Sequence, residues 1–299
     1  MPFILRIATQ KNIESVEYYK KNMRILILGS GQDAGIPQAG CYCNVCKTAR
    51  IDVNYRRLGP SIAIFDKWKG FCYFVDASPD FKYQLDMAHK EINETKRRGR
   101  IPVSGILLTH AHPGHCCGLW HLGKVALNEK NLPVYCTSEM EQFLYKNDPF
   151  SLLIKEKNIM TERVHPNEEF KLNGLKCTPI QVSHRNEIAD TVGYIMGSKK
   201  KVIYLPDVDR WTEDILKEIE SSDRALIDGT FFSKMELPRF KEVPHPPIQE
   251  TIELLNNTNT EVYFTHINHT NPINRKGKER QYVERKGFKI AYDGMILDI

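Results

Sequence analysis

Short apolar runs, separated by polar residues and turn formers, recur along the whole chain. Runs of this length are typical of strands, and the longer amphipathic stretches between some of them are typical of helices. The predicted strands cover residues 24–28, 61–65, 71–75, 103–109, 132–136, 170–172, 175–182, 191–196, 201–205, 224–227, 261–265, 289–292 and 295–298. The predicted helices cover residues 79–97, 115–122, 138–157, 212–219 and 247–256. Because strands and helices mix in both halves, the pattern indicates an α/β architecture.

The pattern also indicates how the chain divides. Residues 1–22 precede the first clear strand, and we expect them to be an N-terminal extension. Residues 23–299 contain no sequence repeat, low-complexity tract or obvious linker. A chain of 299 residues is long enough for one large sandwich domain or two small ones, and no linker divides it. We therefore predict a single domain over residues 23–299.

One polar segment interrupts this pattern in an unusual way. Residues 109–115, T-H-A-H-P-G-H, place His110, His112 and His115 directly after an apolar run. Neutral imidazole is the commonest protein ligand for zinc-like ions. His110 and His112 point the same way on an extended segment, and His115 turns as the chain enters the next helix. The segment therefore predicts a site for one metal or two adjacent metals.

Three more metal-capable side chains follow predicted strands elsewhere in the chain. His184 closes the run 175–183, Asp207 follows the run 202–206, and His266 follows the run 261–265. In sheet proteins, functional residues gather where strands end. We therefore expect these three side chains to join the histidines of residues 109–115.

The segment 41–46, C-Y-C-N-V-C, predicts a second metal site. Its three thiolates, from Cys41, Cys43 and Cys46, are close enough to surround one ion, and a fourth ligand would close a structural zinc site. A redox pair or a disulfide are the alternatives, but a bridge across one residue is strained and a third thiol would stay unpaired. The other five cysteines, Cys72, Cys116, Cys117, Cys136 and Cys177, are interpreted mostly as small core residues.

Composition restricts the choice of partners. The net charge is +5, from 42 basic and 37 acidic residues, so no general attraction to polyanions is implied. We interpret the basic clusters at 96–100, 199–201 and 275–280 as solvated turns and expect no nucleic-acid partner. Apolar runs are too short to span a membrane, and the first residues lack a convincing secretory signal. The thiolate cluster favours a reducing compartment, and we expect a cytoplasmic protein.

The order of these groups resembles the metallo-β-lactamase superfamily: T-H-x-H-x-x-H, then a strand-end histidine, a strand-end aspartate and a late T-H. The resemblance extends over residues 23–299 and implies a four-layer αββα sandwich. Two branches are similar. The pyrroloquinoline quinone biosynthesis protein B group shares segments within 29–38, the cysteine cluster, and segments within 77–80, 228–232 and 266–272. The cyclic phosphodiesterase of phosphonate breakdown shares the cysteine cluster, the metal histidines and T-H-I-x-H at 265–269.

The resemblance implies a division of the ligands between two active-site ions, which would be zinc, manganese or iron. The implied ligands are His110, His112 and His184 for one ion, and His115 and His266 for the other, with Asp207 bridging the two. Asp76, at the end of the strand 71–75, would lie beneath the metals.

Further roles are expected by analogy with the family. Asp207 would orient the attacking water or bridge to the second ion, and His245 would donate a proton to the leaving group. His269 would complete the structural zinc site. Gly114, however, stands where the superfamily motif has an aspartate, so we expect the second metal to bind more weakly and hydrolysis to be impaired.

Three functions follow as hypotheses. The first is a metal-dependent hydrolase in which a metal-activated water attacks a phosphodiester or ester-type substrate. The second is an iron-dependent oxygenase or hydroxylase related to the quinone-biosynthesis group, since histidine and carboxylate ligands also suit ferrous iron. The third, a non-enzymatic scaffold, would not need Asp207 and His266. We expect a small-molecule or peptide-derived substrate, and a homodimer is compatible with the sequence.

Overall fold

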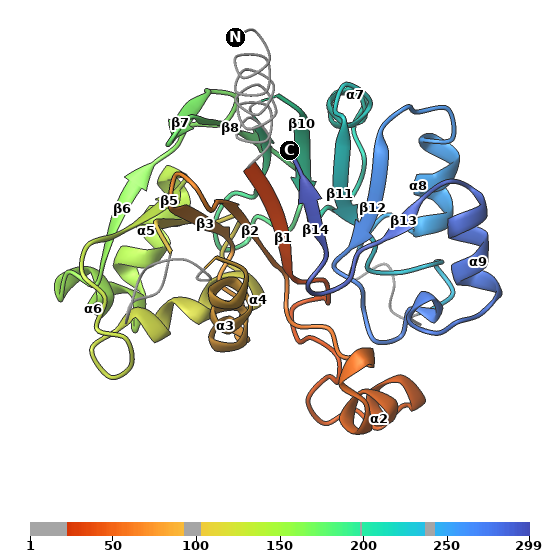
Figure 1. The fold of residues 1–299 in the computed structure, drawn as a ribbon, viewed down its shortest axis with the longest axis horizontal. Helices are drawn as coiled ribbons and strands as arrows, with labels where there is room; N and C mark the ends of the chain where they lie inside the picture. The colour runs from red at the N-terminus through yellow and green to blue at the C-terminus, as the bar shows by residue number, and fades with distance from the viewer. Residues whose placement is uncertain (1–22, 93–102, 198, 237–242) are drawn as a thin grey trace, which may run out of the picture.

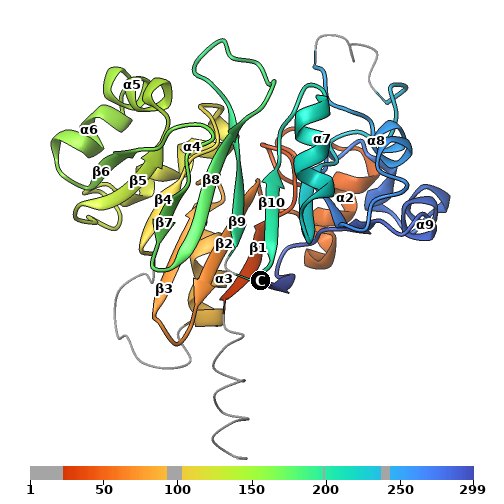
Figure 2. The same cartoon turned by 90° about the horizontal axis from the view of Figure 1, so that it is seen from above.

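The computed structural model describes residues 23–92, 103–197, 199–236 and 243–299. Within them, two seven-stranded sheets pack face to face (Figures 1 and 2). The first sheet has the order β14 (Ile296–Asp298), β1 (Met23–Gly29), β2 (Ser61–Asp66), β3 (Phe71–Val75), β4 (Gly105–Leu107), β5 (Leu132–Cys136) and β6 (Ile159–Arg163). The second has the order β13 (Lys289–Ile290), β12 (Glu261–Thr265), β11 (Arg224–Asp228), β10 (Lys201–Leu205), β9 (Val192–Gly197), β8 (Leu175–Gln181) and β7 (Phe170–Leu172).

Helices cover the outer face of each sheet. Those beside the first sheet are α3 (Phe81–Ile92), α4 (Pro113–Cys116), the 3-10 helix η2 (Cys117–Leu122), α5 (Ser138–Lys146) and α6 (Phe150–Lys155). Those beside the second sheet are α7 (Glu213–Glu220), α8 (Ile248–Leu254) and α9 (Lys278–Arg285). Helix α2 (Asn44–Ile51) projects away from the sheets at the bottom of Figure 1. Short 3-10 helices, η1 (Val53–Tyr55) and η4 (Pro272–Asn274), lie in loops.

Strand β1 shows why the layers form. Leu26 and Leu28 pack in the cluster under the helices, whereas Ile25 and Ile27 pack in the cluster between the sheets. A strand buried on both faces reads as a continuous apolar run. The predicted four-layer αββα sandwich is therefore confirmed.

Strand directions bring the predicted site residues to one edge. Strands β3 to β6 run parallel, as do β10 to β13, and β8 runs antiparallel to β9, which is itself antiparallel to β10. The carboxyl ends of β8, β10, β11 and β12 consequently lie at the same edge of the second sheet. The loops after these strands, and those after β3 and β4, carry the polar residues described below.

Most predicted elements are present, with instructive differences. Strand β4 is shorter than predicted, and α2, α9 and β6 were not predicted. Helix α9 buries only Val283 and β6 only Ile159, so neither gives a clear apolar pattern. The basic residues at 275–280 were predicted as a turn, and Lys278 instead begins α9. Likewise, Lys201 begins β10.

Some predictions fall on residues that the structure does not describe. These are the N-terminal extension, the end of the helix predicted at 79–97 and the basic cluster at 96–100. Among the described residues, no helix is both long and apolar enough to cross a membrane.

Candidate metal centre

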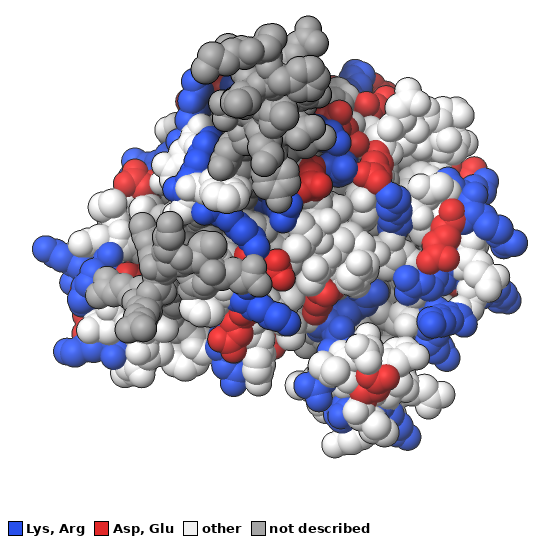
Figure 3. Space-filling view, viewed as in Figure 1, with Lys and Arg blue, Asp and Glu red and all other residues white. Residues whose placement is uncertain are grey.

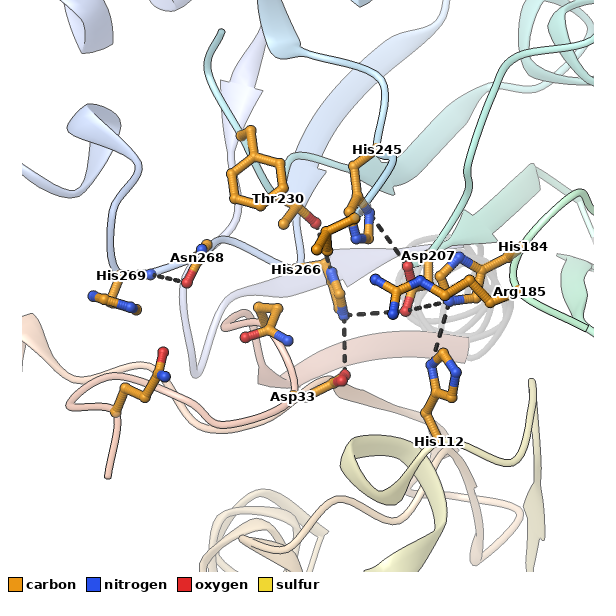
Figure 4. Close-up of a pocket in the computed structure, with 14 residues that line it drawn as sticks. Asp33, His112, His184, Arg185, Asp207, Thr230, His245, His266, Asn268 and His269 are labelled. Carbon is orange, nitrogen blue, oxygen red and sulfur yellow. Dashed lines mark hydrogen bonds and ion pairs between the residues drawn. The ribbon is translucent and has the colours of Figure 1, made fainter. Parts of the chain in front are cut away.

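The predicted site residues come together where the two sheets meet (Figure 4). His110 follows β4, His184 follows β8, Asp207 follows β10 and His266 follows β12. Their side chains are almost fully buried, with His110 and His184 each 2% exposed and Asp207 3% exposed. Residues that are distant in sequence thus form one compact polar cluster.

A first group of metal-capable atoms comes from His110, His112, His184 and Asp207, and these atoms all lie within 4.8 Å of one another. His184 Nε2 lies 3.3 Å from His112 Nδ1 and 3.2 Å from Asp207 Oδ2. His110 Nε2 lies 3.5 Å from the same Asp207 oxygen. The structure therefore brings together the predicted ligands of the first metal.

A second group comes from Asp33, His115, Asp207 and His266, also within 4.8 Å. Asp207 Oδ2 lies 3.7 Å from His115 Nε2 and 3.6 Å from His266 Nε2. One oxygen of Asp207 thus faces both groups, as the predicted bridging role requires. Asp33, in the glycine-rich loop after β1, was not predicted to belong to the site.

Buried polar atoms without partners indicate that both groups suit a metal ion. His110 Nε2, His115 Nε2 and Asp207 Oδ1 are buried and form no hydrogen bond within the described residues. Buried polar atoms in folded proteins are nearly always satisfied, by protein groups, by water or by an ion. Imidazole nitrogens and carboxylate oxygens are ligands of zinc, manganese and iron, so the donor set fits the predicted metals.

His115, His184 and His266 are each held by a neighbour at the nitrogen opposite the cluster. Nδ1 of His115 lies 2.7 Å from Asp76 Oδ2, and Nδ1 of His184 lies 2.8 Å from Asp209 Oδ1. Nδ1 of His266 lies 2.8 Å from Thr230 Oγ1. Such contacts fix the ring orientation of metal-binding histidines.

Asp76 has the position that was predicted for it. It is fully buried at the end of β3 and has a left-handed backbone, with φ of 66°. Besides its contact with His115, its Oδ1 accepts hydrogen bonds from Thr109 N at 2.8 Å and Thr109 Oγ1 at 2.9 Å. One carboxylate therefore holds the start of the histidine loop and its last histidine.

The electrostatics of the cluster favour an ionised carboxylate at its centre. Burial opposes ionisation of Asp207, but His266, His184 and His245 outweigh it and hold the pKa of Asp207 well below its usual value. Burial also opposes protonation of His115, yet Asp76 and Asp33 raise its pKa to about 10. Metal ions therefore compete with protons for this site.

His245 joins the same cluster from the loop before α8. It is 5% exposed, and its Nδ1 lies 2.7 Å from Asp228 Oδ2 and 3.3 Å from Asp207 Oδ1. Burial lowers the pKa of His245, but Asp228 and Asp207 outweigh this effect and raise it. A carboxylate-bound histidine beside the metal groups suits proton transfer.

A cavity of about 220 Å³ opens onto the centre. Its lining residues are Gln32, Asp33, Gln38, His112, His184, Arg185, Asp207, Thr230, Phe231, Val243, His245, His266, Asn268 and His269. Arg185 was not predicted, although its position directly after His184 is a signal that could have identified it. For Asp33, the signal was the missing carboxylate at Gly114.

The cysteine cluster lies beside the cavity. Sγ atoms of Cys41, Cys43 and Cys46 and a ring nitrogen of His269 all lie within 4.8 Å. His269 Nδ1 lies 3.5 Å from Cys41 Sγ and 3.6 Å from Cys43 Sγ. Three thiols and one imidazole match a closed zinc site. Cys46 lies within α2.

The eight cysteines all lie in described residues and are free thiols. Burial alone opposes ionisation of Cys43, but hydrogen bonds from the Cys46 backbone and from His269 lower its pKa to about 6. Outside the cluster, Cys72, Cys116, Cys136 and Cys177 are buried, as predicted for core residues, and Cys117 is partly exposed.

Comparisons with known proteins agree with this geometry. A β-lactamase superfamily domain profile matches residues 73–267. Coenzyme PQQ synthesis protein B of Rhizobium meliloti (strain 1021) is 27% identical over 92% of this chain and 97% of its own length. The crystal structure of zinc-bound PqqB from Methylobacterium extorquens has a TM-score of 0.80 and 26% identity, covering 92% of this chain and 100% of that one.

A second solved structure comes from another branch. A diphosphatase from the PhnP family has a TM-score of 0.70 and 25% identity, covering 93% of this chain and 97% of that one. Both structures share the sandwich described above, and the family profile includes β3, the histidine loop and β12. The chain belongs to the metallo-β-lactamase superfamily and resembles its PqqB members.

Proposed function

We propose that this chain is a metal-dependent hydrolase that cleaves a phosphodiester or ester-type bond in a small molecule. The observation that supports this most is the position of Asp207, whose Oδ2 faces both groups of metal-capable atoms. A centre that bridges two ions across one carboxylate suits hydrolysis of a phosphoester bond. The likeness to a PhnP-family diphosphatase points in the same direction.

The residues of the centre would have distinct roles in metal binding and catalysis. His110, His112 and His184 hold one divalent metal, and His115 and His266 hold the other. Such a metal, when bound, lowers the pKa of a coordinated water towards ~7 and supplies a nucleophile at neutral pH. Asp207 Oδ1, which lacks a hydrogen-bond partner within the described residues, can accept a proton of that water and orient it.

His245 would act on the leaving group. Nδ1 of His245 lies 2.7 Å from Asp228 Oδ2, so the other ring nitrogen, Nε2, is available to a ligand in the cavity that His245 lines. A histidine in this position can donate its proton to the departing oxygen. Asp228 also accepts hydrogen bonds from Val208 N and Thr230 N, so it positions His245 relative to Asp207.

An iron-dependent oxygenase is the second candidate. It is favoured by likeness to PQQ synthesis protein B over 92% of the chain, and by a histidine and carboxylate donor set that also suits ferrous iron.

We also infer a reducing compartment such as the cytoplasm, because the three cluster cysteines need to stay reduced to bind zinc.

Two measurements on purified protein test the hydrolase. Elemental analysis should find zinc or manganese above the equivalent assigned to the cysteine cluster, and bis(p-nitrophenyl) phosphate should be cleaved. His110→Ala and Asp207→Asn should bind less active-site metal than the wild type. Each should also cleave bis(p-nitrophenyl) phosphate at least about 100-fold more slowly. The matched controls are His165→Ala and Asp214→Asn, which change exposed residues outside the site and should behave as the wild type. Iron above the structural zinc, with oxygen consumption and no phosphodiester cleavage, would instead support the oxygenase.

A further inference from the structure

We propose that Asp33 supplies the second metal's carboxylate in place of the aspartate that Gly114 lacks. This inference rests on the proposed function only in requiring a metal at the second group. Asp33 Oδ1 lies 3.1 Å from His115 Nε2 and 3.4 Å from His266 Nε2. With Asp207, these residues give four donors, a complete protein ligand set for one ion.

Space at Gly114 explains why the carboxylate comes from another loop. A Cβ at position 114 would lie 2.4 Å from Asp33 Cβ, 2.4 Å from Asp33 Oδ1 and 2.5 Å from Asp33 Cγ. No real Cβ is found so close to other atoms, and the contacts involve the root of a short side chain that cannot move aside. Position 114 can therefore carry a side chain only if position 33 does not extend into the same space.

The loop that carries Asp33 is fixed from both sides. Gly31 N donates to Leu58 O at 2.9 Å, and Gln32 N donates to Ile267 O at 3.1 Å. Ile267 directly follows His266, so the loop is attached to the segment that bears another ligand. Gly35, with φ of 63°, then turns the chain so that Ile36 N reaches Arg57 O at 2.7 Å.

The charge of Asp33 suits this role. Its side chain is 30% exposed and borders the cavity. Its Oδ1 faces the Nε2 atoms of both His115 and His266, at 3.1 and 3.4 Å. The second group therefore includes two carboxylates, Asp33 and Asp207. With Asp33 as a ligand, the absence of a carboxylate at Gly114 does not weaken the second metal site.

Metal content tests the exchange between positions 33 and 114. After dialysis against metal-free buffer and reconstitution with Mn²⁺ or Zn²⁺, Asp33→Ala should bind about one equivalent less than the wild type. Asp33→Gly/Gly114→Asp should regain that equivalent, because glycine at position 33 has no Cβ to meet the new side chain and the carboxylate returns from the other loop. Gly114→Asp alone should unfold at a lower temperature than the wild type, since the new side chain would overlap that of Asp33.

Several results would overturn the assignment. Full stoichiometry and unchanged affinity in Asp33→Ala would show that Asp33 is not a ligand. Failure of Asp33→Gly/Gly114→Asp to bind more metal than Asp33→Gly would show the same. If Asp33→Ala does not fold, Asp33→Asn, which keeps the shape, should still weaken the second site. Another outcome is that the wild type cleaves no ester while Asp33→Ala still binds less metal than the wild type. That pair of results would reject the hydrolase and support Asp33 as a ligand.

The buried Nε of Arg185, which forms no hydrogen bond within the described residues, supports a second inference. Figure 4 shows the Arg185 side chain extending into the pocket beside Asp207 and His184. Within the described residues, its buried Nε forms no hydrogen bond, and no carboxylate pairs with the guanidinium. A buried guanidinium donor without a partner is costly, so a ligand that satisfies it would bind favourably.

We infer that Arg185 binds an anionic oxygen of the substrate, a phosphate or carboxylate group adjacent to the reacting bond. The planar guanidinium donates in pairs to such groups. The rest of the cavity lining is mainly polar, including Gln32, Gln38 and Asn268, and so suits a charged ligand. This inference deepens the proposed function by selecting anionic over neutral substrates.

Binding of simple anions tests Arg185 without requiring turnover. In metal-loaded protein, Arg185→Ala should weaken inorganic phosphate at least about tenfold in calorimetry, and Arg185→Lys should weaken it less. Acetate, compared in the same variants, distinguishes a carboxylate site from a phosphate site. Arg210→Ala, which changes an exposed arginine nearby in sequence, is the matched control. Unchanged affinity for both anions in Arg185→Ala, with metal content intact, would contradict the inference. Tight phosphate binding without ester cleavage would instead reject only the hydrolase.

Discussion

At the scale of single residues, His115, His184 and His266 each have two contacts, one to the centre and one to a neighbour behind the ring. His115 lies between the centre and Asp76, and His184 between the centre and Asp209. A ring held on both sides loses little freedom when an ion binds. The supporting carboxylates are thus expected to influence metal affinity without touching the metal.

Asp76→Asn tests this support. Asparagine tolerates the left-handed backbone that Asp76 adopts, so the fold should persist while the charge is lost. We expect metal affinity to fall by roughly 10- to 100-fold, measured by competition with a chromophoric chelator. Asp86→Asn, on the exposed face of α3, should leave the affinity unchanged. Wild-type affinity in Asp76→Asn would show that the contact with His115 is only structural.

The residue scale also shows what could be predicted from sequence. His110, His184, Asp207 and His266 could be identified because each follows an apolar run that forms a strand. Asp33 could not, because its place depends on tertiary contacts of its loop with Leu58 and Ile267. Those contacts leave no local pattern.

At the scale of elements, α2 depends unusually little on apolar packing. Its buried residues are Val45, Cys46 and Ala49, and the apolar cluster beneath them adds only Ile36. Few apolar contacts mean a low local stability. This also explains why the helix was not predicted, since its ordering relies on the cysteine cluster more than on an amphipathic face.

Cys46→Ser is expected to remove one equivalent of zinc and to lower the melting temperature, because zinc binding contributes to folding. Elemental analysis and thermal unfolding measure the two effects. Cys117→Ser, which changes a partly exposed thiol outside the cluster, should retain the zinc. A Cys46→Ser protein with unchanged zinc content would mean that the cluster is not a metal site.

The edge of the second sheet gives a pH-dependent prediction. Glu261 on β12 pairs with Arg224 on β11 at 2.6 Å and with Lys289 on β13. Burial alone would raise the pKa of Glu261, but these cations lower it to about 2. Because the folded-state pKa lies below the unfolded value near 4.5, the pair stabilises the protein above about pH 4.5 and ceases to do so as the pH falls through about 2.

Glu261→Gln should therefore reduce the free energy of unfolding at pH 7, by less than about 1 kcal/mol because the side chain is partly exposed. The difference from the wild type should shrink as the pH is lowered, and urea unfolding at several pH values measures it. A difference that grows towards acid would reverse the assigned sign. Glu250→Gln, with an exposed partner in Lys234, should show a smaller effect.

At the scale of the whole molecule, the centre belongs to neither sheet alone. The loops of the first sheet supply Asp76 and the histidines from 110 to 115, and those of the second supply His184, Asp207 and His266. The site is complete only when the sheets are packed. In the space-filling view of Figure 3, basic and acidic side chains are interspersed over the face that is shown, which fits the small net charge.

Tyr194 links the sheets next to the centre. It is fully buried on β9, and its hydroxyl donates to Leu108 O, two residues before His110, at 2.8 Å. Tyr194→Phe should lower the free energy of unfolding by about 1–2 kcal/mol, because it leaves that carbonyl without the donor. Urea unfolding measures the loss. An unchanged free energy would mean that the carbonyl finds another partner.

The sandwich itself could be predicted, because a strand that is buried on both faces appears in the sequence as a continuous apolar run. Which strands become neighbours could not, since pairing joins segments from opposite ends of the chain. Strand β14 illustrates this, for it pairs with β1 in the register Arg24 with Asp298 and Leu26 with Ile296.

That pairing has a consequence for biosynthesis. One edge of β1 is covered by β2 early in the chain, but its other edge receives β14, and Ile299 N donates to Met23 O at 3.0 Å. On the ribosome, β1 emerges long before its second neighbour is made. An unpaired apolar strand edge is prone to join other chains. The nascent protein therefore exposes one edge of β1, an open template for aggregation, until β14 has left the exit tunnel.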